Sequence, residues 1–340
     1  MTERLLSVED LKVSFYTRDG ENQAVRGVSF HIDAGETVGI VGESGSGKSV
    51  TAKAIMSLIA PPGKITSGNI EFRGENLSGL SEKQWRKLRG NRIAMVFQDP
   101  MTSLNPVKKI GQQLTEVIRR HRGLNKEEAL KEAASILRQV GINNPEQRLQ
   151  QYPHEFSGGM RQRVMIAMAL SCKPELLIAD EPTTALDVTI QAQILDLFKE
   201  LKGNLSTAVA LITHDLGVVA QVCTRVIVMY GGLVMEEGTV EDIFYRPQHP
   251  YTKGLLRSIP KRDGKSRERL VPIEGTPPDL LNPPSGCPFM ERCPHAFSRC
   301  SERPPVTTLS SGHRSMCWLA EGEQETEAVA FVEGSGSVER

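Results

Sequence analysis

Four short, continuous apolar runs recur along this chain, and each ends in polar or glycine-rich residues. They cover residues 37–41, 93–97, 176–179 and 209–213. Continuous apolar runs of this length are typical of strands that are buried on both faces. Turns and helical patterns separate the runs, so the chain is predicted to be an α/β protein built around a parallel sheet.

Strands of a second kind are predicted near the start of the chain and after the last apolar run. Residues 6–15 and 25–32 alternate between apolar and polar positions, as in a two-stranded ribbon. Residues 226–230 and 233–236 are apolar on either side of two glycines and predict a closing hairpin.

A helical block interrupts the strand pattern. Apolar residues between 110 and 140 recur at helical spacing among charged ones, which predicts a helical subdomain inserted into the sheet-containing fold. The stretch at 63–79 is rich in turn residues and is expected to hold one short strand at 69–72.

Residues 42–49 carry the strongest chemical signal. They read Gly-Glu-Ser-Gly-Ser-Gly-Lys-Ser and lie between the apolar run at 37–41 and a predicted helix at 50–59. Glycines in this pattern let backbone N–H groups approach phosphates, and the helix N-terminus adds partial positive charge. Lys48 is expected to reach the β- and γ-phosphates, and the Ser49 hydroxyl to bind Mg²⁺. A merely flexible Gly/Ser loop would leave the flanking strand and helix unexplained. The residues expected at the nucleotide are Gly42, Ser44, Gly45, Ser46, Gly47, Lys48, Ser49 and Val50.

Two carboxylates follow the apolar run at 176–179. Asp180 suits a Mg²⁺ ligand acting through water, and Glu181 suits a general base that polarises the attacking water. The alternative is a solvated strand end. His214 follows the run at 209–213 and is a candidate sensor of the γ-phosphate, although a lone histidine is more often structural or exposed.

Two weaker patterns indicate a nucleotide site only in combination with the motifs above. Ser157, Gly158 and Gly159 precede a helix, and the N-terminus of that helix could bind a second phosphate through its N–H groups and partial positive charge. A serine cap with glycines, however, occurs in many loops. Phe15 or Tyr16 is a candidate for stacking on adenine, and an ordinary aromatic residue of the core is an equal alternative.

Composition narrows the class of protein. The 340 residues include 41 Lys plus Arg and 41 Asp plus Glu, so net charge does not indicate nucleic acid as a partner. Apolar runs stay shorter than the roughly 18 residues that a membrane span needs. The start of the chain lacks the basic and apolar segments of a signal peptide. A soluble, intracellular protein that docks on a membrane protein is expected.

Taken together, these motifs resemble the ATP-binding-cassette ATPases over residues 5–245. Gln98, Asp187 and the motifs above occur in the order that the family shows, with the helical insertion between Gln98 and Ser157. The resemblance implies a P-loop nucleotide-binding domain with a RecA-like core, an antiparallel β subdomain and an inserted helical subdomain at about 99–165. One departure is Phe156, because the commonest signature begins with leucine.

The resemblance also implies roles and partners. Two ATPase chains would pair head to tail, with the loop at 42–49 facing the partner's signature across ATP. Gln98 would contact Mg²⁺ and water, Glu181 would be the base, His214 would hold the γ-phosphate, and Asp187 would communicate across the interface. Because all these residue types are present, an active ATPase is expected.

The remaining chain narrows the resemblance. Residues 247–252, 272–278 and 286–289 read Pro-Gln-His-Pro-Tyr-Thr, Pro-Ile-Glu-Gly-Thr-Pro-Pro and Gly-Cys-Pro-Phe. Composition alone indicates a proline-rich linker. The sequence, however, resembles the C-terminal extension of ATPases from bacterial dipeptide and oligopeptide importers. That implies a second ATPase subunit, two permease subunits, indirectly a peptide-binding protein, and a peripheral position on the cytoplasmic face of the inner membrane. Expected boundaries are 1–245, 246–322 and a flexible tail at 323–340.

Four cysteines of the extension are candidate metal ligands: Cys287, Cys293, Cys300 and Cys317. In a reducing compartment such a cluster more often indicates metal than disulfides. Spacings of five, six and sixteen residues lack the short pairs typical of structural zinc, and the family resemblance also favours a [4Fe–4S] cluster. Zinc and free cysteines stay open as alternatives.

Two other functions fit part of this pattern. A nickel or other small-solute importer would share every catalytic motif, but the long cysteine-bearing tail favours peptides. A soluble cassette ATPase acting on DNA or ribosomes would more often carry basic patches, coiled-coil insertions or two cassettes in one chain.

Overall fold

The computed structural model describes residues 3–99, 103–183, 191–196, 198, 207–258, 272–310 and 312–321. The chain forms two compact units and passes between them several times. The first comprises Met1–Ser7, His31–Val38 and Asn69–Thr213, and the second Val8–Phe30, Gly39–Gly68 and His214–Arg340.

The first unit contains the parallel strands that the apolar runs predict. They are β6 (Ile93–Val96), β7 (Leu176–Asp180) and β8 (Ala208–Ile212), and β7 lies between the other two. All three strands are buried along their whole length. Because parallel strands end at the same edge of a sheet, Val96 lies beside Ala179, and Asp180 beside Ile212.

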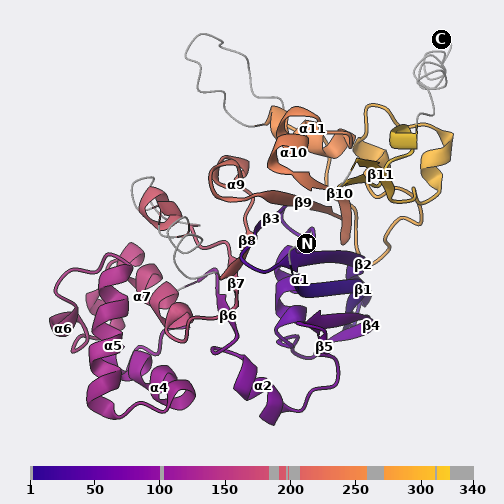
Figure 1. Cartoon of the computed structure of the whole chain (residues 1–340). Coiled ribbons are helices and arrows are strands. Elements are labelled where there is room, and N and C mark those ends of the chain that lie inside the picture. The colour runs from indigo at the N-terminus through magenta and orange to yellow at the C-terminus, as the bar shows by residue number, and fades with distance from the viewer. Residues whose placement is uncertain are drawn as a thin grey trace, which may run out of the picture. The chain divides into compact units, whose positions relative to one another are not determined.

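The helical block also belongs to the first unit. Its helices α4 (Ile110–Arg122), α5 (Lys126–Gln139), α6 (Pro145–Arg148) and α7 (Gly158–Leu170) lie together, as Figure 1 shows. The predicted apolar positions form their shared core, since Leu114, Ile118, Ala133 and Leu137 are all buried. The helices predicted between 110 and 140 are thus present as α4 and α5.

Two elements between 63 and 92 differ from the sequence-based prediction. Strand β4 spans Gly63–Phe72 rather than 69–72 and is followed by β5 (Glu75–Asn76) and helix α2 (Glu82–Leu88). The first half of β4 is mostly exposed, so it lacks the apolar alternation that marks a strand. Helix α2 buries only Trp85, and it begins at a Ser81–Gln84 capping box.

The second unit contains the N-terminal ribbon, the phosphate loop and the C-terminal extension. Strands β1 (Arg4–Thr17) and β2 (Gly20–Asp33) confirm the ribbon, although the chain enters β1 and leaves β2 in the first unit. Strand β3 (Thr37–Val41) also crosses from one unit to the other and leads to helix α1 (Lys48–Ile55).

The predicted hairpin is confirmed and gains two strands at its edge. Strand β9 (Arg225–Tyr230) pairs antiparallel with β10 (Leu233–Thr239) through Gly231 and Gly232, whose φ angles of 53° and 78° favour glycine. The extension adds β12 (His313–Ser315) to β10, and β11 (Thr307–Ser310) to β12. Helices α9 (Leu216–Val222), α10 (Val240–Tyr245) and α11 (Pro250–Arg257) complete this unit together with short 3₁₀ turns.

The described part of the extension packs on the cassette. Cys287, Phe289 and Trp318 share one hydrophobic core with Tyr230 and Tyr251. The proline-rich stretch at 272–284 contacts β2, where the Gln23 N–H donates to the Leu280 carbonyl at 2.9 Å. Residues 272–284 are exposed or half-buried, but hydrogen bonds from Gln23 to Leu280 and from Arg26 to Pro284 attach the segment to β2. The charged residues 261–269 and the predicted tail at 323–340 lie outside the described residues.

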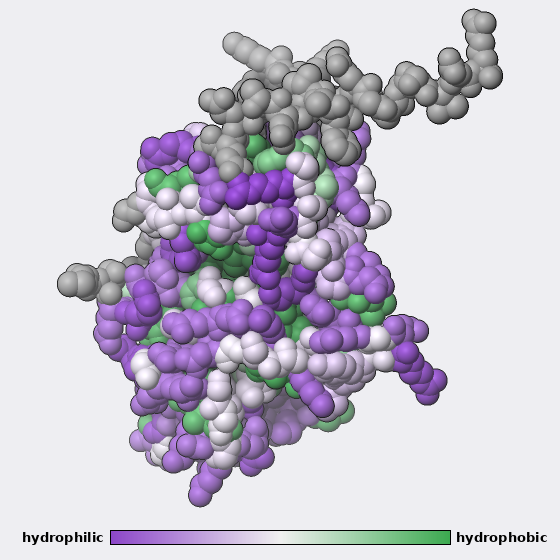
Figure 2. All heavy atoms as spheres, turned by 90° about the vertical axis from the view of Figure 1, so that its right-hand side faces the viewer, coloured by the Kyte–Doolittle hydropathy of each residue, from purple (hydrophilic) through white to green (hydrophobic). Residues whose placement is uncertain are grey.

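The surface seen in Figure 2 is mostly hydrophilic, with hydrophobic residues in small groups among charged ones. No helix in the described part of the chain is long and apolar enough to cross a membrane.

Candidate functional site: a phosphate loop and a glutamine–glutamate pair

The loop at 42–49 connects the buried strand β3 to helix α1. Gly42 has a φ of 150°, and a Cβ there would lie 2.0 Å from the Met229 carbonyl oxygen, so only glycine fits. Gly47 has a φ of 97° and precedes the helix as its N-cap. Ser44 and Gly45 are exposed at the tip of the loop. The backbone thus turns tightly and leaves its tip accessible to a ligand.

Lys48 lies folded into this loop. Its ammonium donates to the Gly42 carbonyl at 2.7 Å, the Glu43 carbonyl at 2.8 Å and the Ser46 hydroxyl at 3.2 Å. The residue is only 5% exposed. A buried positive charge is therefore held at the centre of a loop whose helix N-terminus also attracts anions.

Glu43 is held from the C-terminal extension. Its N–H donates to the Tyr251 hydroxyl at 2.9 Å, and its carboxylate accepts from the Arg292 guanidinium at 2.8 Å. Sequence analysis did not single out Glu43 or Arg292, and it used Tyr251 only as part of a family motif. The sequence did offer one signal for Arg292, because this arginine lies between two candidate metal ligands, Cys287 and Cys293.

The candidate Mg²⁺ ligand and the candidate general base lie at the ends of the parallel strands in the first unit. Gln98 follows β6 and donates its side-chain N–H to the Glu181 carboxylate at 2.9 Å. Asp180 ends β7 and is 3% exposed. The structure thus brings Gln98, Asp180 and Glu181 to one edge of the sheet.

Glu181 has an unusual backbone. Its φ is 46°, in the left-handed region that non-glycine residues rarely adopt, and its N–H donates to the Ile212 carbonyl at 2.9 Å. Strained residues of this kind persist where the surrounding structure fixes them, and they cluster at functional sites. The conformation and the bond from Gln98 together fix the carboxylate.

Ser157 caps helix α7, where its hydroxyl accepts a 3.4 Å bond from the Met160 N–H. Ser157 and Gly158 are exposed, and a Cβ on Gly158 would meet nothing within 4 Å. Phe156 is instead 3% exposed and lies beneath the Arg148 guanidinium. Phe156, one of the two residues that depart from the commonest signature, is therefore a packing residue, while Ser157 and Gly158 are accessible and Gly159 is buried.

The remaining single-residue predictions fall into three groups. His214 is exposed and directly follows Thr213, at the start of the second unit's last segment. Phe15 packs against Gly63, whereas Tyr16 is 45% exposed and donates to Glu21, so Tyr16 is the better candidate for a stacking ring. Asp187 lies outside the described residues.

The four cysteines of the extension gather around one core. Cys287 and Cys300 belong to it, Cys293 packs against it, and Cys317 lies between its members Met316 and Trp318. All four thiols are free. Burial raises the pKa of Cys287 and of Cys293 to about 12, and the neighbouring thiols act in the same direction. Among the described residues, however, no group of three or more His, Cys, Asp or Glu is arranged to hold a metal ion. The predicted cluster is thus not confirmed.

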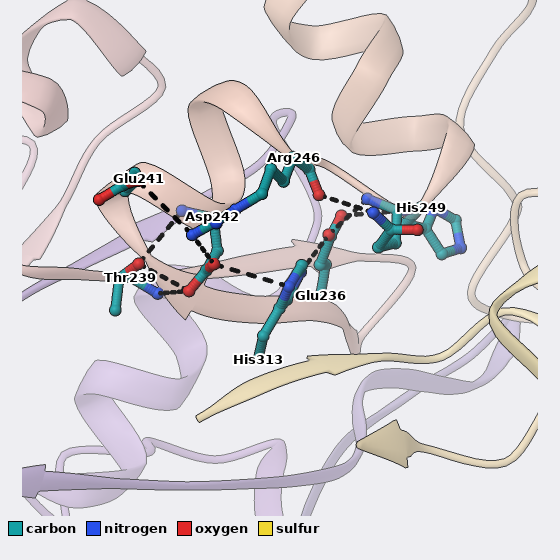
Figure 3. A network of polar contacts seen from close by, with 8 residues as sticks. Glu236, Thr239, Glu241, Asp242, Arg246, His249 and His313 are labelled. Carbon is teal, nitrogen blue, oxygen red and sulfur yellow. Dashed lines mark hydrogen bonds and ion pairs between the residues drawn. The ribbon is translucent and has the colours of Figure 1, made fainter. Parts of the chain in front are cut away.

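A buried polar network joins the extension to β10 (Figure 3). Glu236 accepts from the N–H groups of Gln248 and His249 at 2.7 and 3.0 Å and lies 2.8 Å from the His313 ring. His313 lies 4.0 Å from Asp242 on its other side. Burial lowers the pKa of His249 to about 3, so this helix-capping ring is neutral.

Family models match two parts of the chain. The one described as "ABC transporter" matches residues 25–184, and the one described as "Oligopeptide/dipeptide transporter, C-terminal region" matches residues 235–300.

Several curated proteins are similar over nearly the whole length. The dipeptide transport ATP-binding protein DppD of Bacillus subtilis is 57% identical over 325 residues, covering 95% of this chain and 97% of that protein. The oligopeptide transport ATP-binding protein OppD of the same organism is 58% identical over 318 residues, covering 93% and 89%. OppD of Salmonella typhimurium is 54% identical over 314 residues, covering 92% and 93%.

Among solved structures, the dimeric post-hydrolysis state of the ATP-binding cassette MJ0796 bound to ADP and Pi is similar. The TM-score is 0.63 at 28% sequence identity, covering 69% of this chain and 99% of that chain. From these matches, the chain belongs to the ABC transporter family, among the ATP-binding proteins of dipeptide and oligopeptide transport.

Proposed function

We propose that this chain hydrolyses ATP to power a bacterial importer of dipeptides or oligopeptides. One observation carries the proposal: a hydrolytic set of residues and the extension matched by the oligopeptide/dipeptide transporter model occur in the same chain. A nickel or other small-solute importer is the alternative, because it would use the same hydrolytic residues.

In the proposed reaction the loop at 42–49 binds the phosphates of MgATP. The Lys48 ammonium gives up its hydrogen bonds to oxygens of the loop and donates to the β- and γ-phosphates instead. The N–H groups at the start of α1 donate to other phosphate oxygens. Ser49, Gln98 and Asp180 would hold Mg²⁺. The ion would neutralise charge that develops on the phosphates.

Glu181 acts as the general base on the attacking water. Gln98 holds the Glu181 carboxylate and so orients it toward that water. His214 would bind the γ-phosphate. The leaving group is ADP, and the proton taken from water is transferred to Glu181.

We further propose a head-to-tail dimer with a second ATPase subunit on two permease subunits at the cytoplasmic face of the inner membrane. The exposed Ser157 and Gly158 support this arrangement, because they are free to read the partner's ATP. Asp187 would lie at the interface. After cell lysis, the chain should sediment with membranes only when its permease is co-expressed, and sedimentation without permease would contradict this assembly.

The substrate is tested in proteoliposomes that hold the complete transporter. Hydrolysis of ATP is expected to rise several-fold when the peptide-binding protein is loaded with a dipeptide or a tetrapeptide, and to stay at its basal rate with Ni²⁺. Stimulation by Ni²⁺ alone would replace the peptide assignment with the nickel alternative while leaving the ATPase assignment intact.

For the extension, at about 246–322, we propose a structural metal site formed by Cys287, Cys293, Cys300 and Cys317. The four thiols lie in or beside one core, and cysteine thiolates are the donors that a [4Fe–4S] cluster uses, with zinc as the alternative. The segment is short, and a metal would add stability that its small core does not supply. No step of ATP hydrolysis depends on this site.

Cys287→Ser is expected to remove the metal and to lower the melting temperature by roughly 5 °C, while the hydrolysis of bound ATP changes little. Iron, zinc and acid-labile sulfide are measured in anaerobically purified protein. Wild-type protein should hold about four irons and four sulfides, and the half-buried Cys172→Ser control should keep them. Absence of metal from wild-type protein would contradict the site.

A further inference from the structure

We propose that Tyr251 and Arg292, both in the C-terminal extension, are positioning residues for the phosphate loop. The inference rests on the proposed nucleotide site, and it makes the extension part of the machinery that binds ATP. The relevant contacts all lie within the second unit and converge on Glu43, the second residue of the loop.

Tyr251 fixes the backbone of the loop. Its ring is fully buried and packs on Tyr230 and Phe289, with centroids 4.5 and 5.3 Å away. Burial raises the pKa of the Tyr251 hydroxyl, so this group stays protonated. Because the ring cannot shift without disturbing this packing, its hydroxyl holds the Glu43 N–H in one place.

Arg292 fixes the side chain at the same position. Its side chain is only 6% exposed, and its guanidinium also donates to the Ile273 and Glu274 carbonyls and to the Tyr230 hydroxyl. With Glu43 included, these bonds reach three separate segments, around residues 43, 230 and 273–274, and the planar guanidinium fixes their mutual geometry. The ion pair with Glu43 therefore ties the loop to the extension.

The ion pair of Arg292 with Glu43 also neutralises a negative charge on the loop. A carboxylate on a loop that binds a triphosphate repels the ligand unless a cation neutralises it. Arg292 lies 2.8 Å from the Glu43 carboxylate and supplies that cation. Loss of Arg292 would therefore free the loop and leave an unpaired negative charge on it.

Substitutions test both contacts through the affinity of the full chain for a fluorescent ATP analogue with Mg²⁺. Tyr251→Phe keeps the ring and removes the hydroxyl, and it should weaken binding about three- to tenfold. Arg292→Gln should weaken binding more than tenfold. The double variant Arg292→Gln/Glu43→Gln should recover part of that loss, because the unpaired carboxylate is gone.

This recovery separates positioning from a merely structural role, since the bonds of Arg292 to Ile273 and Glu274 are lost equally in both variants. Matched controls are Tyr245→Phe, at a tyrosine that is 81% exposed, and Arg303→Gln, elsewhere in the extension. Both controls should bind the analogue like wild type.

A second measurement uses wild-type protein alone. Coupling between two sites is reciprocal, so bound ATP should slow backbone hydrogen exchange in residues 287–293. Unchanged affinity in Tyr251→Phe and Arg292→Gln, or exchange at 287–293 that ignores ATP, would overturn the inference. Wild-type protein that binds no ATP would instead overturn the proposed nucleotide site, and this inference with it.

Discussion

Glu181→Gln is expected to lower the rate of ATP hydrolysis about 10²- to 10⁴-fold, the range that a general base contributes. The glutamine amide has nearly the same shape as the carboxylate, and Gln98 can turn its own amide to keep their bond. ATP binding should therefore stay within about twofold of wild type. Phosphate release and analogue binding are measured on the assembled transporter.

The unhydrolysed nucleotide should also trap the two ATPase subunits as a closed pair, which size-exclusion chromatography with ATP detects. Glu146→Gln removes a surface carboxylate of the helical block and serves as the control. Glu181→Gln protein that keeps more than about a tenth of wild-type turnover would remove Glu181 from the role of base.

Lys48→Ala is expected to weaken ATP binding about 10- to 100-fold. A charged hydrogen bond contributes roughly 1.5–3 kcal/mol, and alanine also leaves the Gly42 and Glu43 carbonyls without their donor. Equilibrium binding of the ATP analogue measures the loss.

Lys53→Ala is the matched control, because Lys53 lies on the same helix α1 but is exposed in its last turn. The control should bind ATP like wild type. Equal affinity of the Lys48→Ala variant would show that the ammonium makes no contact with the phosphates.

Sequence patterns predicted those parts of the fold that depend on local apolar spacing. The buried strands β3, β6, β7 and β8 are continuous apolar runs, and the helical block has a clear apolar face, so both were predicted correctly. Gln98 was singled out only through the family resemblance, and its bond to Glu181 became visible in the structure, where both residues follow neighbouring parallel strands.

Other features depend on contacts between distant segments, which local patterns do not carry. The exposed half of β4 and the polar strands β11 and β12 are held by backbone pairing rather than by apolar alternation. The hydrogen bonds of Tyr251 and Arg292 to Glu43 join residues more than 200 positions apart in the sequence. Proline-rich composition indicated a linker, whereas in the structure residues 272–284, although exposed or half-buried, are hydrogen-bonded to β2.

The most direct test of the account is uptake of a labelled dipeptide into proteoliposomes that hold the complete transporter. The peptide-binding protein is placed on the side from which peptide is taken up, and ATP on the side of the ATPase subunits. Proteoliposomes with wild-type protein should then accumulate the labelled dipeptide. Accumulation should stop when this chain carries Glu181→Gln, although ATP still binds. Uptake that continues with Glu181→Gln, or wild-type protein that hydrolyses ATP without moving peptide, would contradict the claim that this chain powers peptide import.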